Sequence, residues 1–324
     1  MQYTKLGWTG LEASVAGLGC GGNSRIGLGA GLSEAQSVAL VREAFDLGVT
    51  LFDTAEAYGT EHIIGAAFTP SERTRIVIST KSRIMRGSEP MSAAEVVANL
   101  DASLKRLRTG HVDLFLLHGV APAHYAHARE VIAPALLAEQ AKGKLRHLGL
   151  SETSPNDPEQ RMLQSALADR TWGVIMLAFH MLNQGARRAV FPLTRQHGVA
   201  TLLMFVVRNI FSQPGVLAKT IADLVAAGKL PAGWADSKDP LGFLVHPGGA
   251  ESLVDAAYRY ARHEPGADVI LFGTSSAAHL RANIASILRP ALPDADRARL
   301  AQAFAHLRGV GLDLPARLTV TPAK

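Results

Sequence analysis

The chain has 324 residues, of which 48% are hydrophobic and 19% are charged, a composition typical of a folded globular protein and not of a disordered one. The net charge of +5 is scattered, without the stripe of Lys, Arg and aromatic residues that predicts a nucleic-acid surface. The sequence also lacks an apolar run of membrane-spanning length and a signal-peptide core, and its single cysteine, Cys20, excludes an internal disulfide. We therefore expect a cytoplasmic protein that binds neither nucleic acid nor membrane and whose partner is a small molecule.

In chain order, short apolar segments alternate with longer amphipathic ones. The short segments are rich in leucine and β-branched residues and lack polar alternation, which is typical of strands buried on both faces. They predict strands over residues 14–19, 50–53, 75–81, 112–118, 145–151, 172–179, 199–205 and 268–273.

Helices are predicted between these strands. Ser33 with Gln36, and Ser92 with Glu95, form the capping-box pattern, and each pair precedes a run whose apolar residues share one helical face. Further helices are predicted over 129–141, 157–168, 185–197, 250–263 and 277–288.

The alternation of strands and helices predicts an α/β fold, a (β/α)8 TIM barrel formed by one domain over residues 1–324. A doubly wound sheet is the alternative, because hydrophobic periodicity does not report whether a sheet closes. Residues 207–249 depart from the alternation and are rich in proline and glycine. They predict a long loop after the seventh strand, and connections of this length are often functional.

The run GLGCGG, residues 17–22, fits the G-x-G-x-x-G pattern of a dinucleotide-binding turn. A Rossmann turn needs a helix that opens at its third glycine and an acidic residue roughly twenty positions later. Here the segment NSRIGLGAGL separates Gly22 from the first helix signal at Ser33, and the positions roughly twenty beyond the run fall inside that helix. The match is therefore interpreted as accidental, and the glycines as the end of the first barrel strand.

Four ionisable residues lie near the ends of neighbouring predicted strands. Asp53, Lys81 and His118 end the second, third and fourth strands, and Tyr58 follows in the loop after Asp53. A phenol with its ordinary pKa of about 10 transfers protons poorly near neutrality, but a neighbouring ammonium lowers the pKa of a phenol, and an aspartate holds that ammonium charged. A histidine can orient a substrate oxygen by a hydrogen bond. The set predicts proton transfer to or from a carbonyl or hydroxyl oxygen, coupled to hydride movement from a cofactor.

Two other chemistries fit parts of this set. Lys81 at a barrel strand end could form a Schiff base with substrate, as in aldolase-type barrels. His118, His124 and His127 could bind a metal, but no cysteine or paired carboxylate joins them, and zinc sites need three or four converging ligands. The sequence favours the proton-transfer set and predicts no metal site.

Five motifs resemble, in order, those of the aldo-keto reductase family: FDTAEAYG (52–59), STKSR around Lys81, LKRLRTGHVDLFLLHG (104–119), GKLRHLGLSE (143–152) and FGTSSAAHLRAN (272–283). The resemblance implies a barrel with an N-terminal hairpin across its bottom, which binds NADP(H), or alternatively NAD(H), without a Rossmann fold. It implies an oxidoreductase that moves a hydride between nicotinamide and an aldehyde, ketone or sugar. Tyr58 would be the general acid/base, tuned by Lys81 and Asp53, with His118 beside the substrate.

The resemblance also implies cofactor contacts, although some positions differ from the family's usual residues. Glu152 stands where the family has asparagine, Met176 where it has glutamine, and His279 where a cation is common. The implied cofactor-binding residues are Gly19, Ser151, Glu152, Met176, Met204, Phe205, Gly273, Thr274, Ser275, His279 and Asn283.

One alternative belongs to a different class of function. The chain could be a cofactor-binding sensor or partner subunit that keeps the pocket but has little turnover. The complete set of four catalytic residues favours the enzyme. The sequence predicts neither the oligomeric state nor the identity of the substrate.

Overall fold

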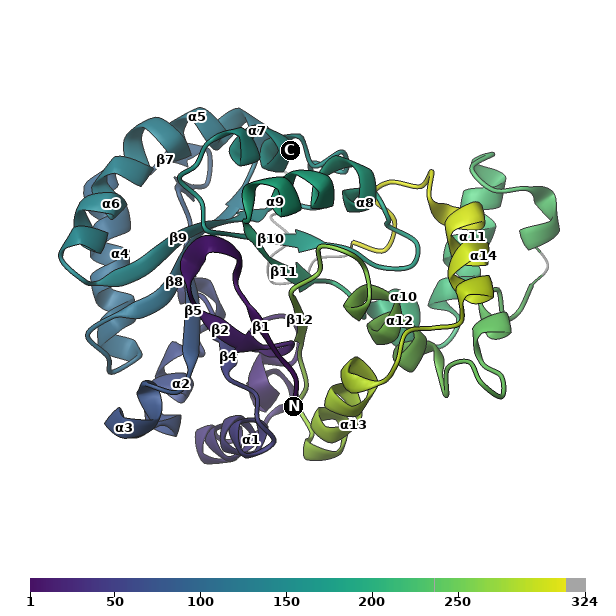
Figure 1. The fold of residues 1–324 in the computed structure, drawn as a ribbon, viewed down its shortest axis with the longest axis horizontal. Helices are drawn as coiled ribbons and strands as arrows, with labels where there is room; N and C mark the ends of the chain where they lie inside the picture. Colours follow the sequence, from purple (N-terminus) through teal and green to yellow (C-terminus); the bar gives the residue numbers. More distant parts are fainter. Residues whose placement is uncertain (236, 313–324) are drawn as a thin grey trace.

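The computed structural model describes residues 1–235 and 237–312 and shows a closed barrel of eight parallel strands (Figure 1). All eight predicted strands are present. Closure excludes the doubly wound alternative, because the last strand pairs with the first, with Ile270 opposite Ala16. In their order around the barrel the strands are β3 (Ala16–Gly19), β4 (Leu51–Asp53), β5 (Val77–Ser82), β8 (Val112–Val120), β9 (Leu145–Glu152), β10 (Val174–Ala178), β11 (Ala200–Met204) and β12 (Val269–Phe272).

The barrel interior is filled by side chains. Leu51, Val77, Leu114 and Val174 belong to one buried cluster inside the strands, and a larger cluster packs between the strands and the helices. Alternate residues of a strand point to opposite faces, so most strands contribute to both clusters, whereas the buried apolar residues of β3 and β9 belong only to the outer one. A Cβ added at Gly17 would lie 2.9 Å from leucine and valine side chains of the interior. The first two glycines of GLGCGG therefore end a barrel strand, as predicted.

The N-terminal hairpin closes the bottom of the barrel. It pairs β1 (Tyr3–Lys5) with β2 (Glu12–Ser14) in antiparallel register, and Leu6 belongs to the cluster inside the barrel. The backbone N–H of Trp8 donates to Gly198 O at 2.8 Å, and the Trp8 ring meets His147 edge-on at 5.6 Å. In Figure 1 the purple hairpin lies across the centre of the barrel. Access is therefore from the opposite end, at the C-terminal ends of the strands.

Helices surround the barrel, and both predicted capping boxes are present. Ser33 caps the first helix and Ser92 the fourth, each accepting a hydrogen bond from the N3 backbone. No helix of the described residues is both long enough and apolar enough to span a membrane. Except in the connection after β11, the elements outside the barrel are α1 (Glu34–Asp46), α2 (Glu61–Ala67), α3 (Pro70–Arg73), β6 (Met85–Arg86), β7 (Glu89–Pro90), α4 (Ala93–Arg106), α5 (Tyr125–His127), α6 (Ala133–Ala141), α7 (Arg161–Ala168), α8 (Ala186–Ala189), α9 (Phe191–His197), α12 (Leu253–Arg262), α13 (Ala277–Leu288) and α14 (Asp294–Phe304).

The connection after β11 is long, as predicted, but partly helical. It contains α10 (Asn209–Ser212), which lies beside α12, and α11 (Val216–Ala226), which contacts α10 and is drawn toward the right of Figure 1. Leu217, Ile221 and Leu224 recur on one face of α11 and are buried, so this helix packs by the usual apolar stripe. Trp234 packs against Phe304 of α14, with ring centroids 5.0 Å apart.

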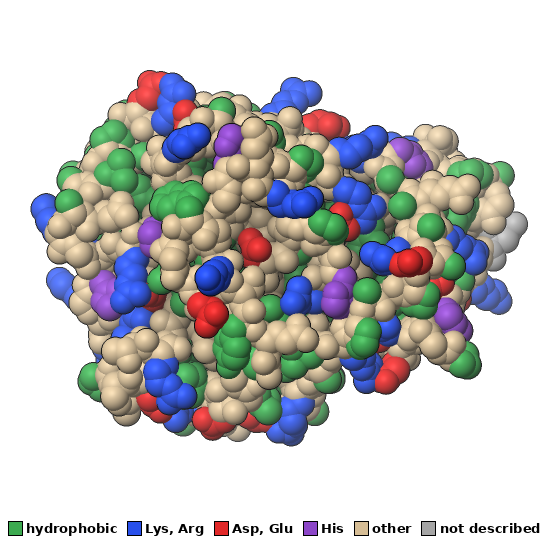
Figure 2. Space-filling model, in the orientation of Figure 1, with side chains coloured by type: hydrophobic (Ala, Val, Ile, Leu, Met, Phe, Trp, Pro, Cys, Tyr) green, Lys and Arg blue, Asp and Glu red, His purple; other side chains and the backbone are tan. Residues whose placement is uncertain are grey.

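The surface shows no single charged stripe on the face drawn in Figure 2. Lys and Arg side chains lie scattered there among acidic and neutral groups.

Candidate active site

A cavity of about 560 Å³ opens at the C-terminal ends of the strands, opposite the hairpin. This volume lies within the range of roughly 300–1,000 Å³ typical of ligand pockets. The cavity brings together much of the predicted site, because the loops after several strands meet at the barrel mouth. Its walls include the predicted residues Gly19, Asp53, Tyr58, Met176, Met204, Phe205, Gly273, Thr274, Ser275, His279 and Asn283.

Beneath the cavity, Lys81 and Asp53 form a buried ion pair. Lys81 Nζ lies 2.7 Å from each Asp53 carboxylate oxygen and 2.8 Å from Thr54 O, and Ser79 Oγ donates to Asp53 Oδ1 at 2.8 Å. The pairing of β4 with β5 sets Asp53 opposite Ser79. Burial opposes the charge of Lys81, but Asp53 and Tyr58 more than offset it and raise the pKa of Lys81 above its ordinary value. Lys81 therefore keeps its proton, and its positive charge is compensated by the Asp53 carboxylate, which borders the cavity.

Tyr58 and His118 face each other above this ion pair. Tyr58 Oη is 3.4 Å from His118 Nε2, and the two rings meet edge-to-face with centroids 5.4 Å apart. Lys81 Nζ lies 5.0 Å from the centre of the Tyr58 ring. Burial, reinforced by the charges of Lys81 and Arg83, lowers the pKa of His118 to about 3. His118 is thus a neutral imidazole, and its Nδ1 has no hydrogen-bond partner among the described residues.

The loop after β3 holds Tyr58 in place. Arg25 Nε donates to Tyr58 O at 2.8 Å, and Thr60 Oγ1 donates to Cys20 O at 3.1 Å. A Cβ added at Gly21 would lie 2.5 Å from Cε2 of the Tyr58 ring. Real Cβ atoms do not approach so closely, so the Tyr58 ring occupies this position only because residue 21 is glycine.

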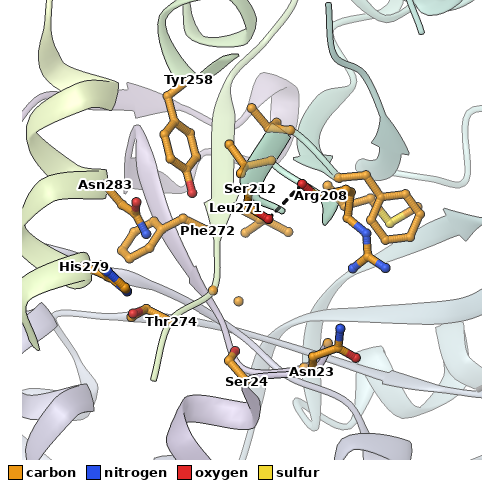
Figure 3. Close-up of a pocket in the computed structure, with 18 of the residues that line it drawn as sticks. Asn23, Ser24, Arg208, Ser212, Tyr258, Leu271, Phe272, Thr274, His279 and Asn283 are labelled. Atoms are coloured by element: carbon orange, nitrogen blue, oxygen red, sulfur yellow. Dashed lines mark hydrogen bonds between the residues drawn. The ribbon is translucent and has the colours of Figure 1, made fainter. Parts of the chain in front are cut away.

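The N-terminal end of α13 forms a polar wall of the cavity. Ser276 caps this helix by accepting a hydrogen bond from His279 N, and Thr274, His279 and Asn283 line the cavity beside it (Figure 3). Ser24 lies across from them, and a Cβ added at Gly273 would be 3.2 Å from its Oγ. The N-terminus of a helix attracts anions through its free N–H groups and dipole. This wall therefore suits a phosphate-bearing ligand.

Two predicted cofactor contacts at the end of β9 do not reach the cavity. Ser151 and Glu152 do not line the cavity, and Glu152 is 3% exposed. Glu152 Oε1 accepts hydrogen bonds from Ala178 N at 2.6 Å and from Ser154 Oγ at 2.8 Å. Met176, which pairs with Ser151 across the two strands, lines the cavity with a thioether and no amide.

Glu152 makes the stability of the fold depend on pH. Burial raises the pKa of Glu152 from 4.5 to about 7, although Ala178 N–H and Ser154 hydroxyl oppose the shift. The folded protein holds the Glu152 proton more tightly than the unfolded chain does. The contribution of this proton to the free energy of unfolding is therefore fully present below pH 4.5 and is lost as pH rises through 7. We expect Glu152→Gln to be more stable than the parent at pH 8, by about 3 kcal/mol, and to differ little at low pH. Urea unfolding at pH 4 and pH 8 measures the difference.

A matched control is Glu139→Gln, because Lys142 and Lys144 lower the pKa of Glu139 and reverse the sign of the effect. Parallel pH profiles for the parent and the Glu152 variant would contradict the prediction.

Several residues that line the cavity were not predicted from sequence. Asn23 and Ser24 follow the glycine run, and their place just beyond a strand end is a signal that could have found them. Arg208 also lines the cavity, and its guanidinium stacks 4.7 Å from the ring centre of the predicted Phe205, whose φ of +62° is rare for a bulky residue. Tyr258 of α12 had no such signal, because an aromatic residue on a helix is usually core.

The metal interpretation gains no support from the histidines. His127 Nε2 is 2.9 Å from Met91 O. In the described part of the chain, no group of three His, Cys, Asp or Glu side chains is arranged to hold a metal ion.

Comparisons with known proteins agree on one family. The family model described as Aldo/keto reductase family matches residues 17–304. Aldo-keto reductase YhdN of Bacillus subtilis (strain 168) is 30% identical over 214 residues, which cover 63% of this chain and 61% of that protein. Probable aldo-keto reductase 1 of Glycine max is 30% identical over 207 residues, which cover 61% of this chain and 57% of that protein. The matched region is therefore about three-fifths of the length of these relatives.

A solved structure shares the fold. The holo form of aldo-keto reductase AKR11C1 from Bacillus halodurans aligns with a TM-score of 0.70 and 21% identity, over 97% of this chain and 100% of that one. Because the family model spans most of the sequence and the barrel is the same, the chain belongs to the aldo/keto reductase family.

Proposed function

We propose that the protein is an NAD(P)(H)-dependent oxidoreductase that moves a hydride between nicotinamide and the carbonyl or alcohol carbon of an aldehyde, ketone or sugar. One observation carries the proposal. The Tyr58 hydroxyl borders the cavity 3.4 Å from the neutral His118, above the buried ion pair of Lys81 with Asp53. Family membership supports the same reaction class.

The chain's own residues handle the proton and the substrate oxygen. When bound, the nicotinamide supplies the hydride for reduction or accepts it in oxidation. Tyr58 gives its proton to the substrate oxygen during reduction and takes it back in oxidation. Lys81 stabilises the negative charge on the Tyr58 oxygen, and Asp53 keeps Lys81 charged and in place. His118, neutral at physiological pH, donates a hydrogen bond that orients the substrate oxygen.

The cavity suits an extended dinucleotide. Thr274 and Ser275, at the N-terminus of α13, would hold phosphate oxygens, and His279 and Asn283 would hold the adenosine end. Gly19, Met176, Met204 and Phe205 would surround the nicotinamide, while the contacts expected from Ser151 and Glu152 have no support from the cavity walls. His279 is the cavity-lining residue of α13 that can carry positive charge, so we propose NADP(H) as the cofactor with NAD(H) as a competitor.

Titration of the purified protein with NADPH and with NADH tests this proposal. Tryptophan fluorescence should be quenched saturably by at least one of the two cofactors. Purified protein that binds neither would contradict the proposal. A protein that binds cofactor but turns over no member of a panel of aldehydes, ketones and aldoses, in either direction, would instead favour a sensor or partner subunit.

A further inference from the structure

Tyr258 presents its hydroxyl to the cavity. It lies on α12, its side chain is only 3% exposed, and it is one of the residues that line the cavity. In Figure 3 its ring hangs from α12 with the hydroxyl directed into the cavity, between Asn283 on one side and Ser212 on the other. Neither the fold nor the catalytic set requires a hydroxyl at this point, because the ring alone fills the space between the helix and the barrel.

The Tyr258 hydroxyl forms no hydrogen bond with any residue that the structure describes. The nearby Ser212 Oγ is already engaged, since it donates to Arg208 O at 3.0 Å. Burial raises the pKa of Tyr258, so the hydroxyl keeps its proton and remains a donor. The hydroxyls of tyrosines whose rings are buried usually have a hydrogen-bond partner. Its partner must therefore come from the cavity.

Tyr260, two residues further along the same helix, shows the contrast. Its hydroxyl accepts a hydrogen bond from Arg187 Nη2 at 2.8 Å, and its ring stacks on Phe179 with centroids 5.7 Å apart. One tyrosine of α12 is thus satisfied by the protein itself, whereas the other faces the cavity with its hydrogen-bonding capacity unused.

The neighbours of Tyr258 indicate which part of a ligand it meets. Asn283 and His279 of α13 line the same side of the cavity, and Thr274 lies at the N-terminus of that helix. An amide, an imidazole and a helix N-terminus together suit the hydrogen-bonding edge of a purine and the phosphate attached to its ribose.

We propose that Tyr258 is a cofactor-binding residue whose hydroxyl donates a hydrogen bond to the adenosine part of the dinucleotide. The proposal rests on the proposed function, because it needs a dinucleotide in the cavity. It assigns Tyr258 to binding and not to proton transfer, since the Tyr258 hydroxyl lies among residues of α13 while the proton donor Tyr58 lies above β4 and β5.

Tyr258→Phe tests the proposal with little risk to folding, because it keeps the ring and removes only the hydroxyl. We expect the dissociation constant for the cofactor to rise about 3- to 10-fold, the equivalent of one hydrogen bond. The affinity for ADP-ribose, which contains the adenosine part, should fall by the same factor. The affinity for nicotinamide mononucleotide, which lacks that part, should not change. The melting temperature without cofactor should stay close to that of the parent, because the variant loses no hydrogen bond to a described residue.

The matched control is Tyr260→Phe, which should lower the melting temperature through the lost bond to Arg187 and leave cofactor affinity unchanged. A Tyr258→Phe protein that binds cofactor and ADP-ribose as tightly as the parent would overturn the proposal while leaving the proposed function intact. A loss of nicotinamide mononucleotide affinity equal to the loss for ADP-ribose would overturn it too, since the effect would then not be local. A parent protein that binds no dinucleotide would instead overturn the proposed function itself.

Discussion

Tyr58→Phe is expected to lower kcat about 10²–10⁴-fold on any carbonyl that the parent protein reduces, the usual contribution of a positioned proton donor. The substitution removes only the hydroxyl. The ring can keep its place against Gly21 and His118, and the ion pair of Lys81 with Asp53 does not depend on the lost oxygen. Cofactor affinity should therefore change little. Turnover is followed by cofactor absorbance at saturating cofactor and substrate, and affinity by fluorescence titration.

A control for the loss of any buried tyrosine hydroxyl is Tyr125→Phe. Tyr125 Oη donates to Asp169 and accepts from Trp172 Nε1, and Tyr125 does not line the cavity. That variant should lose stability but keep kcat. Near-full turnover by Tyr58→Phe would mean that the proton comes from another group, and the proposed chemistry would have to be abandoned. Borohydride-trapped substrate on Lys81 would then point to Schiff-base chemistry instead.

Lys81→Met is expected to lower the free energy of unfolding by about 3–5 kcal/mol at neutral pH, because it leaves the Asp53 carboxylate buried without its partner. Lys81 is fully buried, and among the described residues the Asp53 oxygens that it contacts have only the Ser79 hydroxyl as a remaining side-chain donor. Urea denaturation followed by far-UV circular dichroism gives the loss. Activity should also be lost, since the charge next to Tyr58 disappears.

Adding Asp53→Asn to Lys81→Met should restore a large part of the lost stability, because the double variant no longer buries a lone charge. The difference between the double variant and the sum of the single variants measures the coupling within the pair. A double variant no more stable than Lys81→Met alone would show that the loss comes from packing and not from charge. Activity should stay absent in the double variant, which separates the role in stability from the role in catalysis.

The barrel and the placement of the proposed catalytic residues near strand ends could be predicted because local patterns encode them. Buried strands have continuous apolar runs, Ser33 and Ser92 mark helix starts, and Asp53, Lys81 and His118 each stand at the end or near the end of a strand. Closure was predicted from the number of strands and from the family resemblance, because no local pattern encodes the pairing of β12 with β3. The helical nature of α11 was hidden by the prolines and glycines that surround it.

The residues that line the cavity were harder to predict, because they depend on which face each helix or strand turns to the cavity. Ser151 and Glu152 are adjacent on a strand, and adjacent side chains point to opposite faces, so the pair could not both face one cavity from regular β structure. Glu152 instead bonds to Ala178 and Ser154 outside the cavity. Tyr258 reaches the cavity only through the rotation of α12 against the barrel, which depends on packing along the whole helix.

Gly21 brings no chemical group to the site, yet its missing side chain is the space that the Tyr58 ring fills. Positions 21 and 58 are therefore coupled by space alone. A tyrosine ring in this position requires glycine at residue 21, and a larger residue there would have to displace the ring. Whatever Tyr58 does in the cavity thus depends on the first loop of the barrel as well as on the second.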